Sequence, residues 1–481
     1  MAPVIAPLAA AGGHSVYSGQ TRRRVGVAVS KRRIWGWMAF DWASQPYYTL
    51  GLTFVFGPYF ALVATNAFVA DGMDKLAADA QAQSIWSAGQ TIAGLLIALT
   101  APFLGAFADN SGRKMPWIAG FSVIYVLASA ALWGLAPDGT ALFSILVIFY
   151  VGFFAAESAL NFVNAILPSL GTEREIGRIS GSGAAFGYWG GVVSLFILLL
   201  LFVESPDTGL TLLGHAPALG LDPAGMEGTR SVGPFIALWY AVFMIPFFVY
   251  VRDDPRLGGR STRIGAVWAE LAETLRGVMH RPSLMYFLLS SMFYRDALNA
   301  LYAFGGIYAA LVLGWTTIQI GVFGIVAAIA AAICTWAGGL ADTRYGPKPV
   351  IRACVWLLIV VGCLIVGMSR DHLFIFPLAE TSQVPDLIFY ACGIVIGGAG
   401  GSIYAASRSM MVRHTHPDRP AEAFGLFALT GKATAFLAPA SISLFTFLTG
   451  NVQLGFLPVI FLFLFGLFLL RWVNKDGDRA E

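Results

Sequence analysis

Long apolar segments are the feature that most limits how this chain folds. Twelve of them occur in the 481-residue sequence, at 35–65, 84–108, 115–136, 140–168, 179–203, 232–251, 283–312, 317–341, 347–368, 386–412, 422–449 and 451–472. A helix needs about 20 apolar residues to cross a hydrocarbon layer roughly 30 Å thick. Charged residues make up only 12% of the chain, whereas soluble domains have about 25%. The sequence therefore predicts an all-α integral membrane protein with twelve spans.

The positive charges are sorted between the two sides of the membrane. Of the 30 Lys and Arg residues, the loops on one side carry only Lys75, Arg230 and Arg370, while Arg295 and Lys432 fall within spans. The other 25 lie on the opposite side of the membrane, in the terminal segments, in the alternate loops and at the adjoining span ends. Because cytoplasmic loops are enriched in Lys and Arg, we expect both termini in the cytoplasm. The net charge of only +3 argues against nucleic acid as a partner.

The spans form two groups of six, separated by a polar segment. We expect a disordered cytosolic tail at 1–33, a six-helix half at 34–251, a cytoplasmic linker at 252–282, a second half at 283–473 and a cytosolic tail at 474–481. Apolar residues recur at helical spacing from Ile264 to Met279 in the linker, which predicts an amphipathic helix. This helix lies either on the inner membrane surface or in solvent as an ordinary linker helix.

A short polar motif joins the second and third spans. It reads Gly-Ala-Phe-Ala-Asp-Asn-Ser-Gly-Arg-Lys over residues 105–114, and a looser copy over residues 338–348 joins the eighth and ninth spans. The pattern Gly-x-x-x-Asp-x-x-Gly-Arg-Lys between two membrane helices resembles the signature loop of the major facilitator superfamily of transporters. Two copies in corresponding places indicate an internal duplication. The resemblance implies a twelve-helix fold of two six-helix halves related by a pseudo-two-fold axis.

Ionisable side chains within the spans are few, and each costs several kcal/mol in hydrocarbon. They are Asp41, Glu157, Arg295, Asp296 and Lys432, with Arg408 near a span end. All except Lys432 lie on spans one, four, seven and ten, which line the central cavity in the major facilitator fold. With a rise of 1.5 Å per residue, Asp296 and Lys432 fall near the midplane, where such transporters bind substrate. The structural alternative is that Asp296 or Glu157 only neutralises Lys432 or Arg295.

These side chains are expected to form a pathway for substrate and protons. The pathway consists of Asp41, Glu157, Asp296, Arg408 and Lys432. Asp296 and Glu157 are the expected proton carriers, because burial and nearby cations move the pKa of a carboxylate in opposite directions. Lys432 and Arg408 are expected to hold a substrate carboxylate. Consecutive helical residues point about 100° apart, so we expect Asp296 to face the centre and Arg295 to pack toward a neighbouring helix.

The two motif copies are expected to form a cytoplasmic gate. Its residues are Asp109, Arg113, Asp342 and Lys348. Asp109 stands where a carboxylate can meet the N-terminus of a helix, which is a favourable electrostatic contact. The sequence gives no pattern for a cofactor or a metal, so we expect neither.

Several sequence blocks resemble the vacuolar amino-acid effluxer (autophagy-related) family and its bacterial relatives. In order, they are Phe40-Asp41-Trp42-Ala43, Asn164-Ala165-Ile166-Leu167-Pro168, Gly187-Tyr188-Trp189-Gly190-Gly191, Ser407-Arg408-Ser409 and Gly431-Lys432. The resemblance extends from about residue 34 to residue 473. Relatives usually carry Asn where this chain has Ser44-Gln45-Pro46, and Arg is commoner at Asn110. The resemblance implies a secondary transporter of small solutes, with amino-acid efflux attributed to the fungal members.

We therefore predict a monomeric, multi-pass secondary active transporter in a bacterial cytoplasmic (inner) membrane. It is expected to move a small polar solute, such as an amino acid, across the lipid bilayer by alternating access, coupled to protons. The alternative is a non-transporting sensor or scaffold built on the same fold. None of the six histidines falls within an expected span, which argues against a membrane enzyme.

Overall fold

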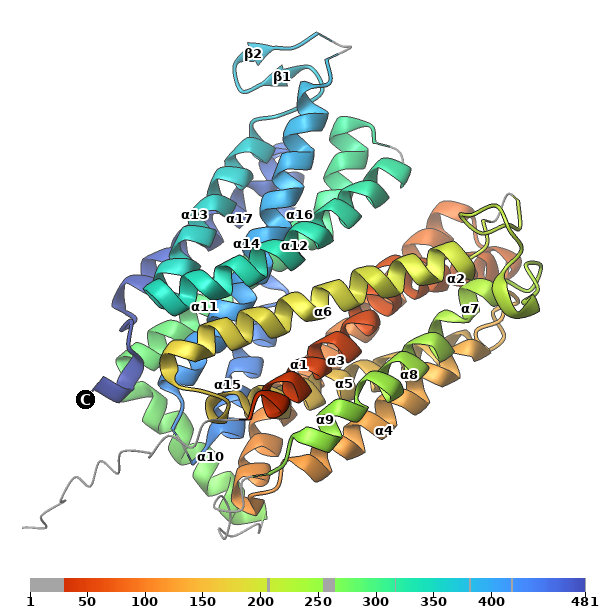
Figure 1. The fold of residues 1–481 in the computed structure, drawn as a ribbon. Helices are drawn as coiled ribbons and strands as arrows, with labels where there is room; N and C mark the ends of the chain where they lie inside the picture. Colours follow the sequence, from red (N-terminus) through yellow and green to blue (C-terminus); the bar gives the residue numbers. More distant parts are fainter. Residues whose placement is uncertain are drawn as a thin grey trace, which may run out of the picture.

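The computed structural model describes residues 30–205, 208–253, 264–315, 317–379, 382–416 and 418–480, and it is almost entirely helical (Figure 1). In this part of the chain, eleven helical segments are long and apolar enough to cross a membrane. They are Lys31–Ala70, Lys75–Ser111, Met115–Gly134, Leu142–Ser169, Glu173–Leu201, Glu227–Tyr250, Gln319–Tyr345, Pro347–Val366, Val384–His414, Pro420–Thr449 and Leu454–Trp472. The predicted all-α membrane architecture is confirmed.

The remaining expected span, 283–312, coincides with helix α11. This helix runs over Pro282–Leu313 and is 32 residues long, which is enough to cross a bilayer. It is not one of the eleven segments above, and it carries both Arg295 and Asp296. The structure is consistent with twelve spans, with α11 as the seventh.

The first half contains a helix that changes its winding inside the membrane. Pro46 ends α1, because a proline within a helix has no N–H to donate, and the chain continues as the π-helical segment η1 before α2. Such π-helical segments are frequent at functional sites. The elements of this half are α1 (Lys31–Pro46), η1 (Tyr47–Phe54), α2 (Phe56–Ala70), α3 (Lys75–Ser111), α4 (Met115–Ala131), η2 (Leu132–Gly134), α5 (Leu142–Asn164), η3 (Leu167–Ser169), α6 (Glu173–Leu201), η4 (Ala218–Gly220), α7 (Glu227–Arg230), α8 (Val232–Phe243) and α9 (Ile245–Tyr250).

The second half also contains an interrupted span. Its eleventh span is divided between α15 and α16, with residues 434–436 between them. A small antiparallel hairpin pairs His372 with Pro377 in the loop before α14. The elements are α10 (Ile264–Met279), α11 (Pro282–Leu313), α12 (Thr317–Tyr345), α13 (Pro347–Val366), β1 (His372–Leu373), β2 (Phe376–Pro377), α14 (Val384–His414), α15 (Pro420–Ala433), α16 (Leu437–Thr449), η5 (Leu454–Phe456), α17 (Leu457–Leu469), η6 (Leu470–Trp472) and η7 (Gly477–Ala480).

The segments outside the spans only partly follow the expected boundaries. Residues 1–29 of the predicted tail lie outside the described residues, and α1 begins at Lys31, so residues 31–33 are helical. Helix α10 has the bounds expected for the linker helix, and it contacts α3 and α11. The expected C-terminal tail is docked, because Asp478 forms an ion pair with Arg281 at 2.7 Å and the N–H of Asn474 donates to Ser283 Oγ.

The two halves meet at one end of the bundle, which carries both motif copies and is called the motif end below. There α3 packs on α15, and α6 packs on α12, while the halves diverge toward the ends that carry the hairpin and α7 (Figure 1). A Cβ atom built at Gly105 would lie 2.3 Å from the carbonyl oxygen of Ala421, and one at Gly181 would lie 2.5 Å from Gly339 Cα. The helices therefore approach so closely only because these residues are glycines.

The two helix contacts are equivalent under the internal repeat. Gly181 and Gly187 in the fifth span align with Gly425 and Gly431 in the eleventh at a constant offset of 244 residues. A Cβ atom at Gly425 would lie 2.5 Å from the carbonyl oxygen of Ala101 on α3. The α3–α15 and α6–α12 contacts thus use equivalent positions of the two halves. This arrangement is the one that a pseudo-two-fold axis between the halves produces.

Gly181→Val should open the motif end, because the added methyl groups would overlap the backbone of Gly339. The measurement is the distance between spin labels at Arg113→Cys and Arg352→Cys, exposed positions in opposite halves, in a background without the four native cysteines. We expect a shift to longer distances. Gly120→Val is the matched control, since a Cβ atom there meets nothing within 4 Å. An unchanged distance distribution in Gly181→Val would contradict this account of the contact.

Candidate functional site

A fully buried arginine connects the two halves. Arg408 on α14 has no exposed surface, and its Nη1 lies 3.2 Å from Asp41 Oδ2 on α1. Its Nε donates to Ser180 Oγ at 3.1 Å, and its Nη2 donates to the Ser180 carbonyl oxygen on α6 at 2.7 Å. The guanidinium carbon lies 5.3 Å and 4.6 Å from the ring centres of Trp37 and Tyr404. Its charge is therefore balanced by Asp41 and its donors are held by the first half.

Asn164 completes this cluster. Its Oδ1 lies 3.4 Å from Arg408 Nη1, and the sequence repeat makes Asn164 and Arg408 equivalent positions of the two halves. Equivalent residues can touch each other only near the axis that relates the halves, so the cluster lies close to the pseudo-two-fold axis. The sequence indicated Asp41 and Arg408, but it gave no sign that Ser180 would hold the guanidinium.

A second pair of opposite charges crosses between the halves, and it is called the central pair below. Lys432 Nζ on α15 lies 3.6 Å from Glu157 Oε1 on α5, and the side chains are 24% and 15% exposed. The hydroxyl of Tyr48, on the π-helical η1, donates to the same Glu157 oxygen at 3.2 Å. Lys432 Nζ also lies 5.2 Å from the ring centre of Phe153. Unlike the Arg408 cluster, the central pair is partly accessible to solvent.

Arg295 packs on the neighbouring helix α15, as expected, whereas Asp296 binds the start of α16. Asp296 is only 3% exposed, and its Oδ2 accepts from the N–H of Ala438 at 2.9 Å. It therefore binds the N-terminus of α16 at the interruption of the eleventh span. Arg295 is partly exposed and lies within electrostatic range of Glu157 and Tyr404. The expectation that Asp296 faces the centre was wrong, because its carboxylate accepts from the N–H of Ala438 in the first turn of α16.

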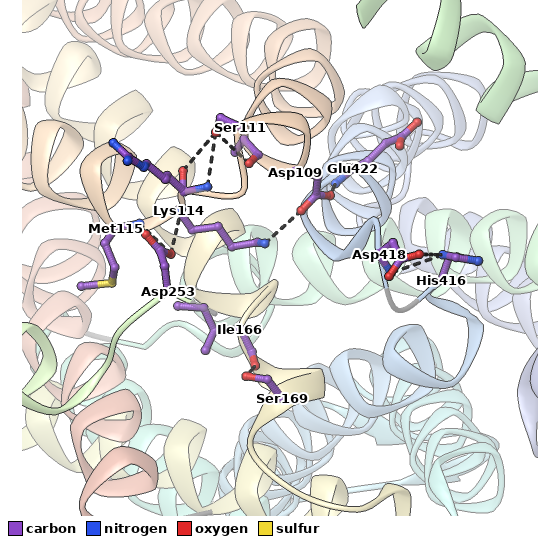
Figure 2. A network of polar contacts seen from close by, with 12 residues as sticks. Asp109, Ser111, Lys114, Met115, Ile166, Ser169, Asp253, His416, Asp418 and Glu422 are labelled. Carbon is purple, nitrogen blue, oxygen red and sulfur yellow. Dashed lines mark hydrogen bonds and ion pairs between the residues drawn. The ribbon is translucent and has the colours of Figure 1, made fainter. Parts of the chain in front are cut away.

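At the motif end, Asp109 connects the halves through the N-terminus of α15. Its Oδ2 accepts from the N–H of Glu422 at 2.9 Å, while Lys114 Nζ lies 3.0 Å from its Oδ1. Figure 2 shows Lys114 reaching Asp109 and Asp253 lying against the start of α4. Asp253 accepts from the N–H groups of Lys114 and Met115 at 2.9 Å and 3.2 Å.

Two of the cations expected at the gate lie elsewhere. Arg113 has an exposed side chain, whereas Lys114 is buried at 5% exposure beside Asp109. Lys348 Nζ donates to the carbonyl oxygens of Arg471 and Val473 at 3.1 Å and 2.6 Å. The structure therefore brings Lys114 to Asp109 in place of Arg113, and it brings Lys348 to the end of the last span. The final Lys of the motif was the signal that the sequence analysis passed over.

Asp342, the counterpart of Asp109, is buried without an equivalent partner. It is 2% exposed, and a Cβ atom at Gly177 would lie 2.5 Å from its Cγ. Ser409 lies nearby, but in the described part of the chain neither carboxylate oxygen forms a hydrogen bond of normal geometry. The reason is the position of the facing helix ends. Helix α15 begins at Pro420, so the N–H of Glu422 lies in its first turn and donates to Asp109, whereas α6 begins at Glu173 and the N–H groups near Gly177 already lie beyond its first turn.

Comparison with known proteins places this geometry in a family context. The model of the family described as "Vacuole effluxer Atg22 like" matches residues 29–481. A Bacillus subtilis protein described as the uncharacterized MFS-type transporter YxiO is 24% identical, over 92% of this chain and 94% of the relative. Autophagy-related protein 22 of Cryptococcus neoformans is 23% identical, over 63% of this chain and 51% of the fungal protein. The match thus spans about half the length of the fungal relative.

Solved structures show the same fold. The human organic anion transporter MFSD10 has a TM-score of 0.62 at 15% identity, covering 91% of this chain and 99% of that structure. The proton:xylose symporter XylE has a TM-score of 0.66 at 11% identity, covering 93% and 95%. Both are major facilitator structures, so the predicted fold class is confirmed. At such low identity, the comparison establishes the fold alone.

Breaking the Arg408 cluster should be more damaging than removing both of its charges. Arg408→Gln leaves Asp41 buried without its cation, which we expect to lower the free energy of unfolding by about 3–5 kcal/mol. Adding Asp41→Asn should restore part of that loss, because the buried negative charge is gone. The measurement is denaturant unfolding of the purified protein in detergent. A double variant as unstable as the sum of the two single variants would show that the two charges are not coupled.

Proposed function

We propose that this chain, which belongs to the vacuole effluxer Atg22-like family of major facilitator transporters, carries a small polar solute by alternating access. In this proposal, transport is coupled to protons. The observation that supports this proposal is the central pair. Glu157 and Lys432 come from opposite halves, meet at 3.6 Å and remain partly exposed. A charged and accessible contact of this kind can break when the halves move, and its charged groups are then available to a solute and a proton.

The motif end acts as the gate in this proposal. Asp109, Lys114 and the N-terminus of α15 hold the halves together there, and the glycine contacts exclude side chains between the helices. With both termini in the cytoplasm, the motif end faces the cytoplasm and is closed in this conformation. On the other side of the centre, the ring of Phe54 reaches Gly324 on α12. Transport would then require the two halves to separate at the motif end and to form further contacts with each other near Phe54.

Glu157 is the proton carrier in this proposal. Its carboxylate is partly accessible, accepts a hydrogen bond from Tyr48 and neutralises Lys432. A proton on Glu157 would break its ion pair with Lys432 across the two halves, which couples proton binding to their movement. Asp296 is less suited to this task, because its carboxylate binds the N-terminus of α16. The solved proton:xylose symporter shows that the fold supports proton coupling.

Several finer features belong to the proposal as well. We place the protein as a monomer in a bacterial cytoplasmic membrane, with Bacillus subtilis YxiO as a relative of nearly the same length. Amino acids are a candidate solute class, because the sequence resembles a family whose fungal members are attributed amino-acid efflux. The relatives are transporters, not enzymes. The accessible central pair favours transport over a sensor or scaffold, and solute flux in proteoliposomes tests this choice.

Glu157→Gln should uncouple transport from protons. We expect loss of uphill accumulation driven by a pH gradient, because glutamine cannot carry the proton, while solute exchange continues because it needs no net proton movement. The measurement is radiolabelled uptake into proteoliposomes with and without the gradient. Asp296→Asn should keep gradient-driven uptake, since its amide oxygen can still accept from Ala438. If Asp296→Asn were uncoupled and Glu157→Gln were not, the two assignments would have to be exchanged.

Asp109→Asn should weaken the closed gate. Loss of the charge removes the ion pair with Lys114 and part of the attraction to the α15 N-terminus, which is worth about 0.3–1 kcal/mol when exposed and up to about 2 kcal/mol when partly buried. We expect slower transport and a larger population that is open at the motif end, measured by flux and by spin-label distances between the halves. Arg113→Gln is the matched control, because the Arg113 side chain is exposed. Wild-type flux in Asp109→Asn at all solute concentrations would contradict the gate.

A further inference from the structure

Arg295 carries a charge that no carboxylate balances within the described part of the chain. Its Nη1 donates to the carbonyl oxygen of Phe427 at 3.0 Å, and its guanidinium carbon lies 4.4 Å from the Phe427 ring centre. Neither group is an anion. Asp296 is adjacent in sequence, but its carboxylate binds the start of α16. A cation inside the membrane without a counter-charge is costly, and such residues usually face a ligand or a partner.

Arg295 differs from the other two cations of the spans in lacking an ion pair. Arg408 is paired with Asp41, and Lys432 is paired with Glu157. No carboxylate lies within 4.0 Å of Arg295 in the residues that the structure describes, because Asp296 binds the start of α16. A bound anion would supply the partner that Arg295 lacks.

The guanidinium is seated so that part of it remains free to bind. A Cβ atom at Gly431 would lie 2.3 Å from Arg295 Nη2 and 2.5 Å from Nη1, so the group fits against α15 because residue 431 is glycine. Nε and Nη2 make no hydrogen bond to the described residues, and they are not among the buried atoms that lack a partner. Each of these donors therefore keeps some exposed surface. The planar fork of N–H groups in arginine matches the two oxygens of a carboxylate.

We propose that Arg295 binds the carboxylate of the transported solute, and that the site prefers a small organic monoanion to a zwitterion or a neutral molecule. This inference rests on the proposed transport function and names its substrate class. A monoanion would give Arg295 an ion-pair partner while Glu157 and Lys432 remain paired. A zwitterion would bring an ammonium group close to the same guanidinium, and the two like charges would repel each other. Arg295, rather than Arg408, is then the residue that selects the solute by its charge.

The test uses solutes that share one carbon skeleton and differ in charge. Thermal unfolding of the purified full chain in detergent is followed at constant ionic strength with sodium L-lactate, L-alanine or lactamide, and also with sodium benzoate. A ligand that binds only the folded state raises the unfolding temperature in proportion to the logarithm of its concentration over its Kd. We expect the carboxylate anions to raise the unfolding temperature, and alanine and lactamide to have much smaller effects.

The variants assign that effect to Arg295. Arg295→Gln should raise the apparent Kd for the stabilising carboxylate at least 10-fold, and Arg295→Lys should raise it less because it keeps the charge but loses the fork. Gly431→Ala should also weaken binding, since its methyl group displaces the flexible guanidinium while the protein still folds. Arg352→Gln, at an exposed position on α13, should leave the Kd unchanged.

Three results would overturn the inference. They are no stabilisation by either carboxylate, equal stabilisation by alanine or lactamide, and stabilisation that survives in Arg295→Gln. Flux in proteoliposomes separates this inference from the transport function. Carboxylate binding that depends on Arg295, without any carboxylate flux, would support the site and contradict transport. Flux of a neutral solute that Arg295→Gln does not change would support transport and contradict the site.

Discussion

The positive charge of Arg408 has to be balanced inside the membrane, and the way in which it is balanced determines how the two halves meet. The guanidinium is completely buried, and its partners Asp41, Asn164 and Ser180 all belong to the other half. A buried charge that loses its partner is strongly destabilising, so α14 is held against α1 and α6. The cluster lies near the pseudo-two-fold axis, because the equivalent residues Asn164 and Arg408 touch each other there.

The closed end is only partly symmetric, although the helices that form it are equivalent. The α3–α15 and α6–α12 contacts use corresponding glycines. Asp109 is ion-paired with Lys114 and accepts from the first turn of α15, whereas in the described part of the chain Asp342 has no equivalent ion pair. The difference follows from where the facing helices begin. Helix α15 begins two residues before its contact with Asp109, whereas α6 begins four residues before Gly177. One half of the motif end is thus bound by charge, and the other half is held by close packing around a buried carboxylate.

Much of this arrangement is visible in the sequence, because the membrane allows few solutions. The lengths of the apolar segments predicted the spans. The seventh span, α11, is less apolar than the others because it carries Arg295 and Asp296. Asp41, Glu157, Arg408 and Lys432 were noticeable as charges within or near apolar segments, and the structure places them in two pairs that cross between the halves. The pairing itself was not predictable from spacing. Residues that lie hundreds of positions apart in the chain are brought together only by the packing of the halves.

The sequence by itself determined which segments cross the membrane, where the motif repeats and which residues bring charge into the hydrocarbon. The tertiary structure decided the direction in which each charge points. Asp296 turns to α16 because the interruption after Ala433 leaves the N–H of Ala438 in the first turn of a new helix, and Arg295 packs against Phe427 on α15. Lys114, not Arg113, reaches Asp109, because the turn at Gly112 and the start of α4 direct only one of the two side chains inward. The rotation of a side chain about its helix depends on what the neighbouring helices offer, and local sequence does not contain that information.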